Sequence, residues 1–140
     1  SMIPVGGYVF SGVKVVRKAD NTIELLQKAA NKADKAVPGS GPVAGTKKHT
    51  VFKQEVKKLD NPLLDTEVTY LNGKIENYGT KGGVRLDVVE YNPDGTIKAV
   101  YDLKTGGATL SPQRIDQILT HILGPGIPNP GIPVTMIKPQ

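Results

Sequence analysis

The stretch that decides the fold runs from Val84 to Thr105 and reads VRLDVVEYNPDGTIKAVYDLKT. Two segments within it, 84–91 and 96–104, are rich in Val, Ile, Leu and Tyr, which is the composition of β-strands. The tetrapeptide Asn92-Pro93-Asp94-Gly95 between them is a strong turn signal, because Pro restricts one backbone dihedral angle and Gly accepts a positive one. The stretch therefore predicts an antiparallel β-hairpin.

Three charged residues, Asp87, Asp102 and Lys104, interrupt these apolar strands. A charge inside a buried strand is costly to desolvate unless it is paired or bound to a metal. A turn of even length sets Asp87 opposite Val100, so that Asp87 and Asp102 become diagonal neighbours on one face, with backbones roughly 7–8 Å apart. Lys104 shares that face because it lies two residues beyond Asp102. We therefore expect two carboxylates and one ammonium to converge.

Converging carboxylates suit a divalent cation, since Mg²⁺ and Mn²⁺ prefer carboxylate, carbonyl and water oxygens. Such an ion stabilises the charge that develops in an in-line phosphoryl displacement. Lys104 would then orient or deprotonate the water, or neutralise the transition state. The alternative interpretation is structural, with Asp102, Lys104 and Arg85 forming an ion pair on a solvated face of the sheet, because Asp-x-Lys spacing is common.

The segments on either side of the hairpin predict the order of the remaining elements. Periodicity and capping signals predict helices over 21–36, 47–59 and 112–123, and short apolar runs predict strands over 67–71 and 134–137. The Pro/Gly-rich segment Val37–Gly45 is interpreted as a linker. We therefore divide the chain into residues 1–45, which hold a leader, a first helix and this linker, and a domain over residues 46–140. This domain has the order helix, three strands, helix, strand, which indicates an α/β or α+β fold.

Composition excludes several classes of protein. The chain has 140 residues and no Cys, so it has neither a disulfide framework nor a thiolate zinc site. With two His there is no histidine-rich metal cage, and no apolar run approaches the roughly 20 residues of a membrane span. We also expect no secretory signal peptide.

Positive charge is concentrated in the first part of the chain. Residues 1–60 hold 11 Lys and Arg against 5 Asp and Glu, net +6, whereas residues 61–140 hold 7 against 8, net −1. A basic half indicates a polyanionic partner such as nucleic acid. The alternative is a set of solvated lysines with no such partner.

Asp87, followed after a hairpin by Asp102-Leu103-Lys104, resembles the PD-(D/E)-x-K superfamily of restriction-endonuclease-like nucleases, whose αβββαβ core carries a mixed sheet flanked by helices. The runs GTKKHTVFKQEVKKL and YGTKGGVRLDVVEYNPDGTIKAVYDLKTGGATLSPQRIDQILTHI are similar to toxin domains of this fold at the C-termini of bacterial polymorphic toxins. These include Rhs-type effectors and contact-dependent inhibition proteins. The resemblance covers about residues 45–123.

The resemblance implies a role for each matching residue. Asp87 and Asp102 would ligate a divalent metal, with the Leu103 carbonyl assisting, and Lys104 would be the catalytic lysine. Mg²⁺ is the first expectation, with Mn²⁺ or Zn²⁺ as alternatives. Glu55, from the first helix of the domain, would add a third carboxylate to the metal site, although it is equally an i, i+3 partner for Lys58.

The sequence departs from the family pattern at two positions. Leu86 precedes Asp87 where the family name has Pro, and Gln117 is followed by His121 where some members have Gln-x-x-x-Tyr. Neither His49 nor His121 has a Ser or Asp at the spacing of a hydrolase triad.

Basic and polar residues near the expected site are candidates for substrate binding, because lysines surround the first helix of the domain and the N-terminus of the last helix favours a phosphate. These candidates are Lys53, Lys57, Arg85, Thr105, Gln113, Arg114 and Gln117.

The function implied is that of a metal-dependent endonuclease, with DNA favoured over tRNA as substrate. As the C-terminal toxin of an interbacterial effector, it would be delivered from the producing bacterium, act in the cytoplasm of the target cell and require an acidic immunity protein. The alternatives are a tRNA-directed ribonuclease toxin of the same fold and a non-catalytic nucleic-acid-binding module.

Overall fold

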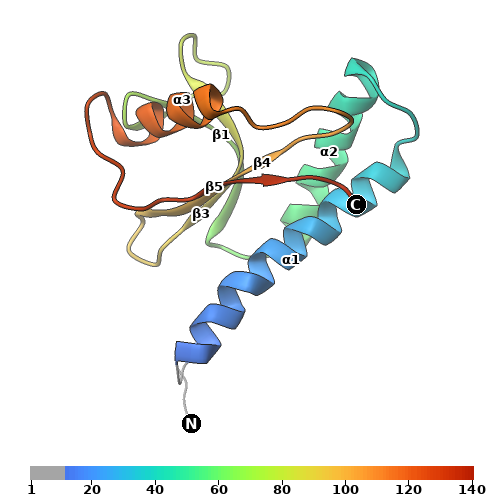
Figure 1. Cartoon of the computed structure of the whole chain (residues 1–140), viewed down its shortest axis with the longest axis horizontal. Coiled ribbons are helices and arrows are strands. Elements are labelled where there is room, and N and C mark those ends of the chain that lie inside the picture. The colour runs from blue at the N-terminus through green and yellow to red at the C-terminus, as the bar shows by residue number, and fades with distance from the viewer. Residues whose placement is uncertain (1–11) are drawn as a thin grey trace.

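The computed structural model contains a five-stranded mixed sheet with α1 and α2 packed on one face and α3 on the other (Figure 1). It describes residues 12–140, with side chains from residue 21 onward. The helices are α1 (Gly12–Ala36), α2 (Pro42–Lys58) and α3 (Pro112–Leu123). The strands are β1 (Leu64–Leu71), β2 (Lys74–Glu76), β3 (Val84–Tyr91), β4 (Ile97–Leu103) and β5 (Val134–Ile137).

The strands lie in the order β2-β1-β3-β4-β5, and every neighbouring pair is antiparallel except β4 and β5. Parallel neighbours need a crossover, and α3 provides it between β4 and β5. The predicted α/β or α+β class is therefore confirmed at the level of a mixed sheet flanked by helices. The additional strand β2 was not predicted; it is short and exposed, and pairs with β1 across the turn at Asn72-Gly73.

Two apolar clusters hold the layers together, one on each face of the sheet. On one face, the cluster is formed by Leu26, Ala29, Ala30, Ala33, Phe52, Val56, Val88, Ala99, Tyr101, Leu103 and Ile137. On the other face, it is formed by Val68, Tyr70, Val84, Leu86, Val89, Val100, Ile118 and Ile122. Tyr101 belongs to the first cluster, and its hydroxyl donates a hydrogen bond to Glu90 at 2.8 Å.

The segment that the sequence interpretation kept apart from the domain packs against it. Helix α1 contributes to the same apolar cluster as α2 and the sheet. The leader predicted before the first helix falls partly in α1 and partly in residues 1–11, which lie outside the described residues. The predicted linker is also shorter, because α2 already begins at Pro42. Proline is compatible with the first turn of a helix, where its missing N–H has no partner to lose.

The hairpin has a different register from the predicted one. Val89 pairs with Val100, and the register shifts between Glu90 and Tyr91. The connection, residues 92–96, is one residue longer than expected and the bulge adds one more residue, Lys98, so the expectation that Asp87 lies opposite Val100 is wrong by two positions. Continuing the observed register by one residue sets Asp87 beside Asp102. Because the error is even, both carboxylates stay together.

Within the described residues, every helix is too short or too polar to cross a lipid bilayer.

Candidate functional site

Asp87 and Asp102 lie in a hollow of about 340 Å³, here called the carboxylate hollow, between α2, the β3–β4 pair and the start of α3. It is lined by His49, Arg85, Asp87, Asp102, Leu103, Lys104, Thr105, Ala108 and Arg114. The structure therefore brings together the two aspartates and the lysine that the sequence singled out.

Asp102 is a buried carboxylate with little local support. Its residue is 6% exposed, and the Lys104 ammonium lies 3.2 Å from Oδ2. Among the described residues, this oxygen has no hydrogen-bond partner of good geometry. Burial and the nearby charge of Asp87 raise the pKa of Asp102, against the opposite effect of Lys104. The site thus contains a carboxylate oxygen that could ligate a metal and that accepts no hydrogen bond from the described residues.

Asp87 is better supported than its neighbour. Its Oδ2 accepts a hydrogen bond from the Leu103 backbone N–H at 2.7 Å and lies 3.7 Å from Nε2 of His49. Burial acts to raise the pKa of Asp87, but the nearby His49 imidazolium and the hydrogen bond from the Leu103 amide outweigh it and leave the pKa below its usual value. Asp87 is therefore ionised at neutral pH.

His49 was missed as a site residue because it lacks the spacing of a triad. Its Nδ1 lies 2.9 Å from the Gly45 carbonyl oxygen and its Nε2 lies 3.1 Å from that of Leu103. Both ring nitrogens face acceptors, so both donate and the ring is an imidazolium. The interaction with the Asp87 carboxylate, 3.7 Å away, is the main cause that raises the pKa of His49 to about 9.

Helical periodicity carries the signal that would have found His49. It lies three residues before Phe52 and seven before Val56, on the stripe of α2 that is buried against the sheet.

Two arginines line the carboxylate hollow. Arg114, on the first turn of α3, donates to Gln117 Oε1 at 2.8 Å and to the Arg85 carbonyl oxygen at 3.5 Å. Ser111, the N-cap of α3, accepts a hydrogen bond from the Arg114 N–H at 3.1 Å. Gln117 therefore acts on the hollow through Arg114, whereas Gln113 is exposed and does not line it.

A second hollow of about 620 Å³, here called the adjoining hollow, shares His49, Arg85 and Thr105 with the first. Its other lining residues are Gly41, Pro42, Gly45, Thr46, Thr50, Lys53, Glu67 and Tyr78. The predicted substrate-binding residue Lys53 lies here and pairs with Glu67 at 2.9 Å. Lys57 lies outside this hollow and lines a separate depression beside Asp60 and Asp65.

The structure does not bring Glu55 to the two aspartates. Its carboxylate pairs with Lys58 at 2.9 Å and with Lys32 of α1 at 3.4 Å, and it lines neither hollow. The physical reason is the position of α1, which occupies the side of α2 on which Glu55 lies. The prediction for Glu55 placed that helix outside the domain.

Glu67 of β1 is an acidic residue that the sequence interpretation overlooked. It has a left-handed backbone conformation, with φ of 52°, and lies at the rung of the β1–β3 pair that contains Asp87, between the pairs at Thr66 and Val68. Its carboxylate is neutralised by Lys53.

The oxygen ligands available for a metal are the carboxylates of Asp87 and Asp102 and the Leu103 carbonyl. The Leu103 carbonyl also accepts a hydrogen bond from His49. In the described part of the chain, no group of three or more His, Asp or Glu side chains forms a metal-binding cluster. The two carboxylates nevertheless fit a hard cation, because Oδ2 of Asp102 is buried without a hydrogen bond and oxygen is the ligand that Mg²⁺ prefers.

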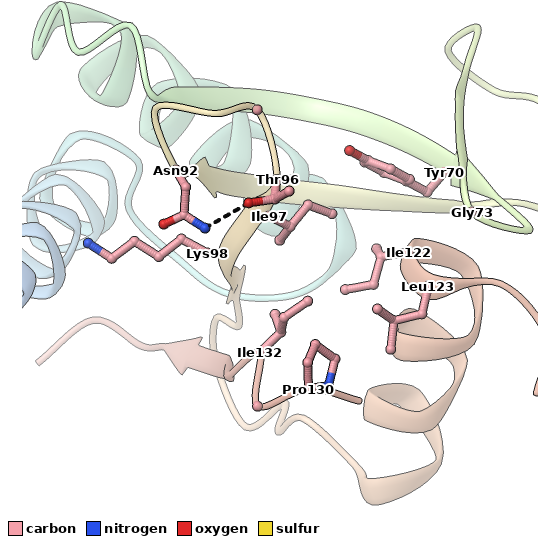
Figure 2. Close-up of a pocket in the computed structure, with 12 residues that line it drawn as sticks. Tyr70, Gly73, Asn92, Thr96, Ile97, Lys98, Ile122, Leu123, Pro130 and Ile132 are labelled. Atoms are coloured by element: carbon pink, nitrogen blue, oxygen red, sulfur yellow. Dashed lines mark hydrogen bonds between the residues drawn. The ribbon is translucent and has the colours of Figure 1, made fainter. Parts of the chain in front are cut away.

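Another hollow, of about 670 Å³, lies at the opposite end of the sheet, between the hairpin turn, the end of α3 and the segment before β5 (Figure 2). Ile97, Ile122 and Ile132 face it, while Asn92 donates to Thr96 at 3.0 Å. None of the described residues that line it is acidic. Its lining is more apolar than that of the carboxylate hollow.

His121 also lies apart from the aspartates. Its Nδ1 accepts a hydrogen bond from the Asn72 N–H at 3.2 Å and so supports the β1–β2 turn.

Comparisons with known proteins return no match: no family model, no curated protein and no solved structure is significantly similar to the chain. The chemistry of the carboxylate hollow is therefore what bears on function.

Proposed function

We propose that the chain is a metal-dependent nuclease that hydrolyses phosphodiester bonds. The supporting observation is that Asp87, Asp102 and Lys104 line one open hollow that also carries cationic side chains. A solvated ion pair of Asp102, Lys104 and Arg85 explains the site less well. Asp102 is 6% exposed, and Arg85 donates its hydrogen bond to Tyr78 instead.

A divalent cation, Mg²⁺ in the first instance, would be held by Asp87 and Asp102 with the Leu103 carbonyl. When bound, such an ion supplies Lewis-acid stabilisation of a phosphoryl oxygen. Lys104, whose ammonium lies 3.2 Å from Asp102, would orient water or stabilise the negative charge of the transition state.

The remaining side chains of the hollow bind and position. The guanidinium groups of Arg85 and Arg114 are suited to phosphate oxygens, which they bind through paired donors. His49 is an imidazolium whose two N–H groups donate to the Gly45 and Leu103 carbonyls, so it places a positive charge beside Asp87 rather than accepting a proton.

The biological setting that we propose rests on the resemblance to the PD-(D/E)-x-K toxin domains of polymorphic toxins. In that setting, the chain cleaves DNA in preference to tRNA in the cytoplasm of a target bacterium, after delivery from the producer. The net charge of +6 over residues 1–60 suits both a nucleic acid and an acidic immunity protein.

The test is nicking of supercoiled plasmid in Mg²⁺, with total RNA incubated in parallel. We expect EDTA, Asp87→Ala, Asp102→Ala and Lys104→Ala each to abolish cleavage in a folded protein. Lys74→Ala is the matched control, because Lys74 is an exposed lysine of β2 outside both hollows.

Two results would contradict the proposal. One is cleavage that persists in EDTA or in the Lys104→Ala protein. The other is binding of nucleic acid without cleavage, which would indicate a binding module. Shortening of RNA with intact plasmid would instead assign the nuclease to RNA.

A further inference from the structure

An exposed aromatic ring stands beside the carboxylate hollow. Tyr78 follows β2 and is 67% exposed. The ring is held in place by Arg85 of β3: the arginine Nη1 donates a hydrogen bond to the tyrosine hydroxyl, and the guanidinium carbon lies 5.1 Å from the ring centroid. A large apolar side chain is thus kept at the surface in a defined position.

The ring adjoins the place where a phosphate would bind. Tyr78 lines the adjoining hollow, which shares Arg85, His49 and Thr105 with the carboxylate hollow. Arg85 precedes Asp87 by two residues of the same strand, a rise of roughly 7 Å. A nucleotide next to a phosphate at the aspartates would therefore come within reach of the ring.

The charges around the ring suit a nucleic-acid strand. Among the described residues that line the adjoining hollow, only Glu67 is acidic, and Lys53 neutralises it at 2.9 Å. Arg85 and the imidazolium of His49 remain as cations facing the same space.

We propose that Tyr78, together with Arg85, forms a stacking site for an unpaired nucleobase next to the phosphate that is cleaved. Aromatic rings and arginine planes bind bases through their faces, and these faces are available only in a single strand or a locally unpaired segment. The inference rests on the proposed function and adds the substrate class: nucleic acid with at least one base outside a duplex.

The experiment uses the full chain in EDTA, so that no cleavage occurs, and a short single-stranded DNA oligonucleotide that contains 2-aminopurine. The fluorescence of this base is quenched when it stacks on an aromatic ring. We expect quenching by the wild type, and weaker binding by about 5- to 150-fold in Tyr78→Ala and Tyr78→Leu. Tyr78→Phe should bind within about twofold of the wild type, because it keeps the ring.

The matched control is Ile75→Ala, which removes another exposed apolar side chain, 60% exposed, from the neighbouring strand β2 and should leave quenching unchanged. The same oligonucleotide annealed to its complement should bind the wild type and Tyr78→Ala equally. Circular dichroism establishes that each variant is folded.

Unchanged quenching in both folded variants, Tyr78→Ala and Tyr78→Leu, would overturn the stacking site. An equal loss in Tyr78→Phe would also overturn it, since the effect would then belong to the hydroxyl bond with Arg85. Failure of the nuclease proposal can be distinguished from failure of the stacking site. If the chain cleaves nothing but its quenching still depends on the Tyr78 ring, only the stacking site is supported. Cleavage by a chain whose binding ignores Tyr78 supports the nuclease alone.

Discussion

Replacing Asp102 by Asn is expected to stabilise the metal-free protein and to abolish cleavage. Asp102 is 6% exposed, and burial and the Asp87 charge raise its pKa despite the Lys104 ammonium 3.2 Å away. Asparagine keeps the shape of the side chain and removes the charge. We expect the free energy of unfolding to rise by about 1 kcal/mol. For a chain of 140 residues this corresponds to a rise in Tm of about 3–5 °C.

The effect should depend on pH in a defined direction. Because folding raises the pKa of Asp102, ionisation of this group destabilises the folded state. The penalty is absent below the pKa of about 4 that Asp has in an unfolded chain, and it is complete above the raised pKa of the folded state. The advantage of Asp102→Asn should therefore be largest at neutral pH and vanish towards a pH of about 4.

Added metal should reverse the order of the two proteins. An ion that binds only the folded state stabilises it by about 2.7 kcal/mol at a hundredfold excess over Kd. The wild type should gain this stability in Mg²⁺, and Asp102→Asn should gain little, because it has lost a ligand.

Thermal and urea unfolding in EDTA and in Mg²⁺ measure both effects, with plasmid nicking on the same samples. Asp116→Asn is the control, since Asp116 is an exposed acidic residue of α3. The reasoning fails if Asp102→Asn is less stable than the wild type in EDTA at pH 7. It also fails if the variant gains as much stability from Mg²⁺ as the wild type does.

The metal-free protein should lose stability as the pH rises from His49's usual pKa of 6.5 through its folded value of about 9, because only the folded state holds the imidazolium. Thermal melts across this range should slope downward for the wild type and be flat for His49→Gln; parallel curves would contradict the assignment. Glu55→Gln is expected to leave the Mg²⁺ activation midpoint and the cleavage rate unchanged, since Glu55 pairs with Lys32 and Lys58; a higher midpoint would return it to the metal site. Ile118→Ala should lower the free energy of unfolding by about 2–5 kcal/mol in urea, because the side chain is fully buried between α3 and the sheet; a loss below about 1 kcal/mol would refute that packing. A neutralising partner should present an acidic surface and bind more slowly at high salt, as stopped-flow mixing would show, and a neutral or basic contact surface would count against this.

Local chemistry determined which segments form the sheet. The apolar runs on either side of Asn92-Pro93-Asp94-Gly95 predicted both strands of the hairpin, and β3 has the predicted bounds. The helix that starts after Ser111 was predicted for the same reason, since its cap, its first-turn proline and its apolar stripe are signals between near neighbours in the chain. Asp87 and Asp102 could be paired because side chains alternate along a strand. An error of two positions does not change the face on which they lie.

Only the tertiary structure decided what surrounds the two aspartates. Periodicity shows which face of α2 is apolar, but the neighbour on each side depends on packing between distant segments. α1 therefore takes Glu55 into an ion pair with Lys32, and the sheet brings His49 against Asp87. The bulge beside Glu90 and the contact between Tyr78 and Arg85 are likewise settled across strands. These features depend on the relative placement of whole elements, which burial and close packing determine only once the chain has folded.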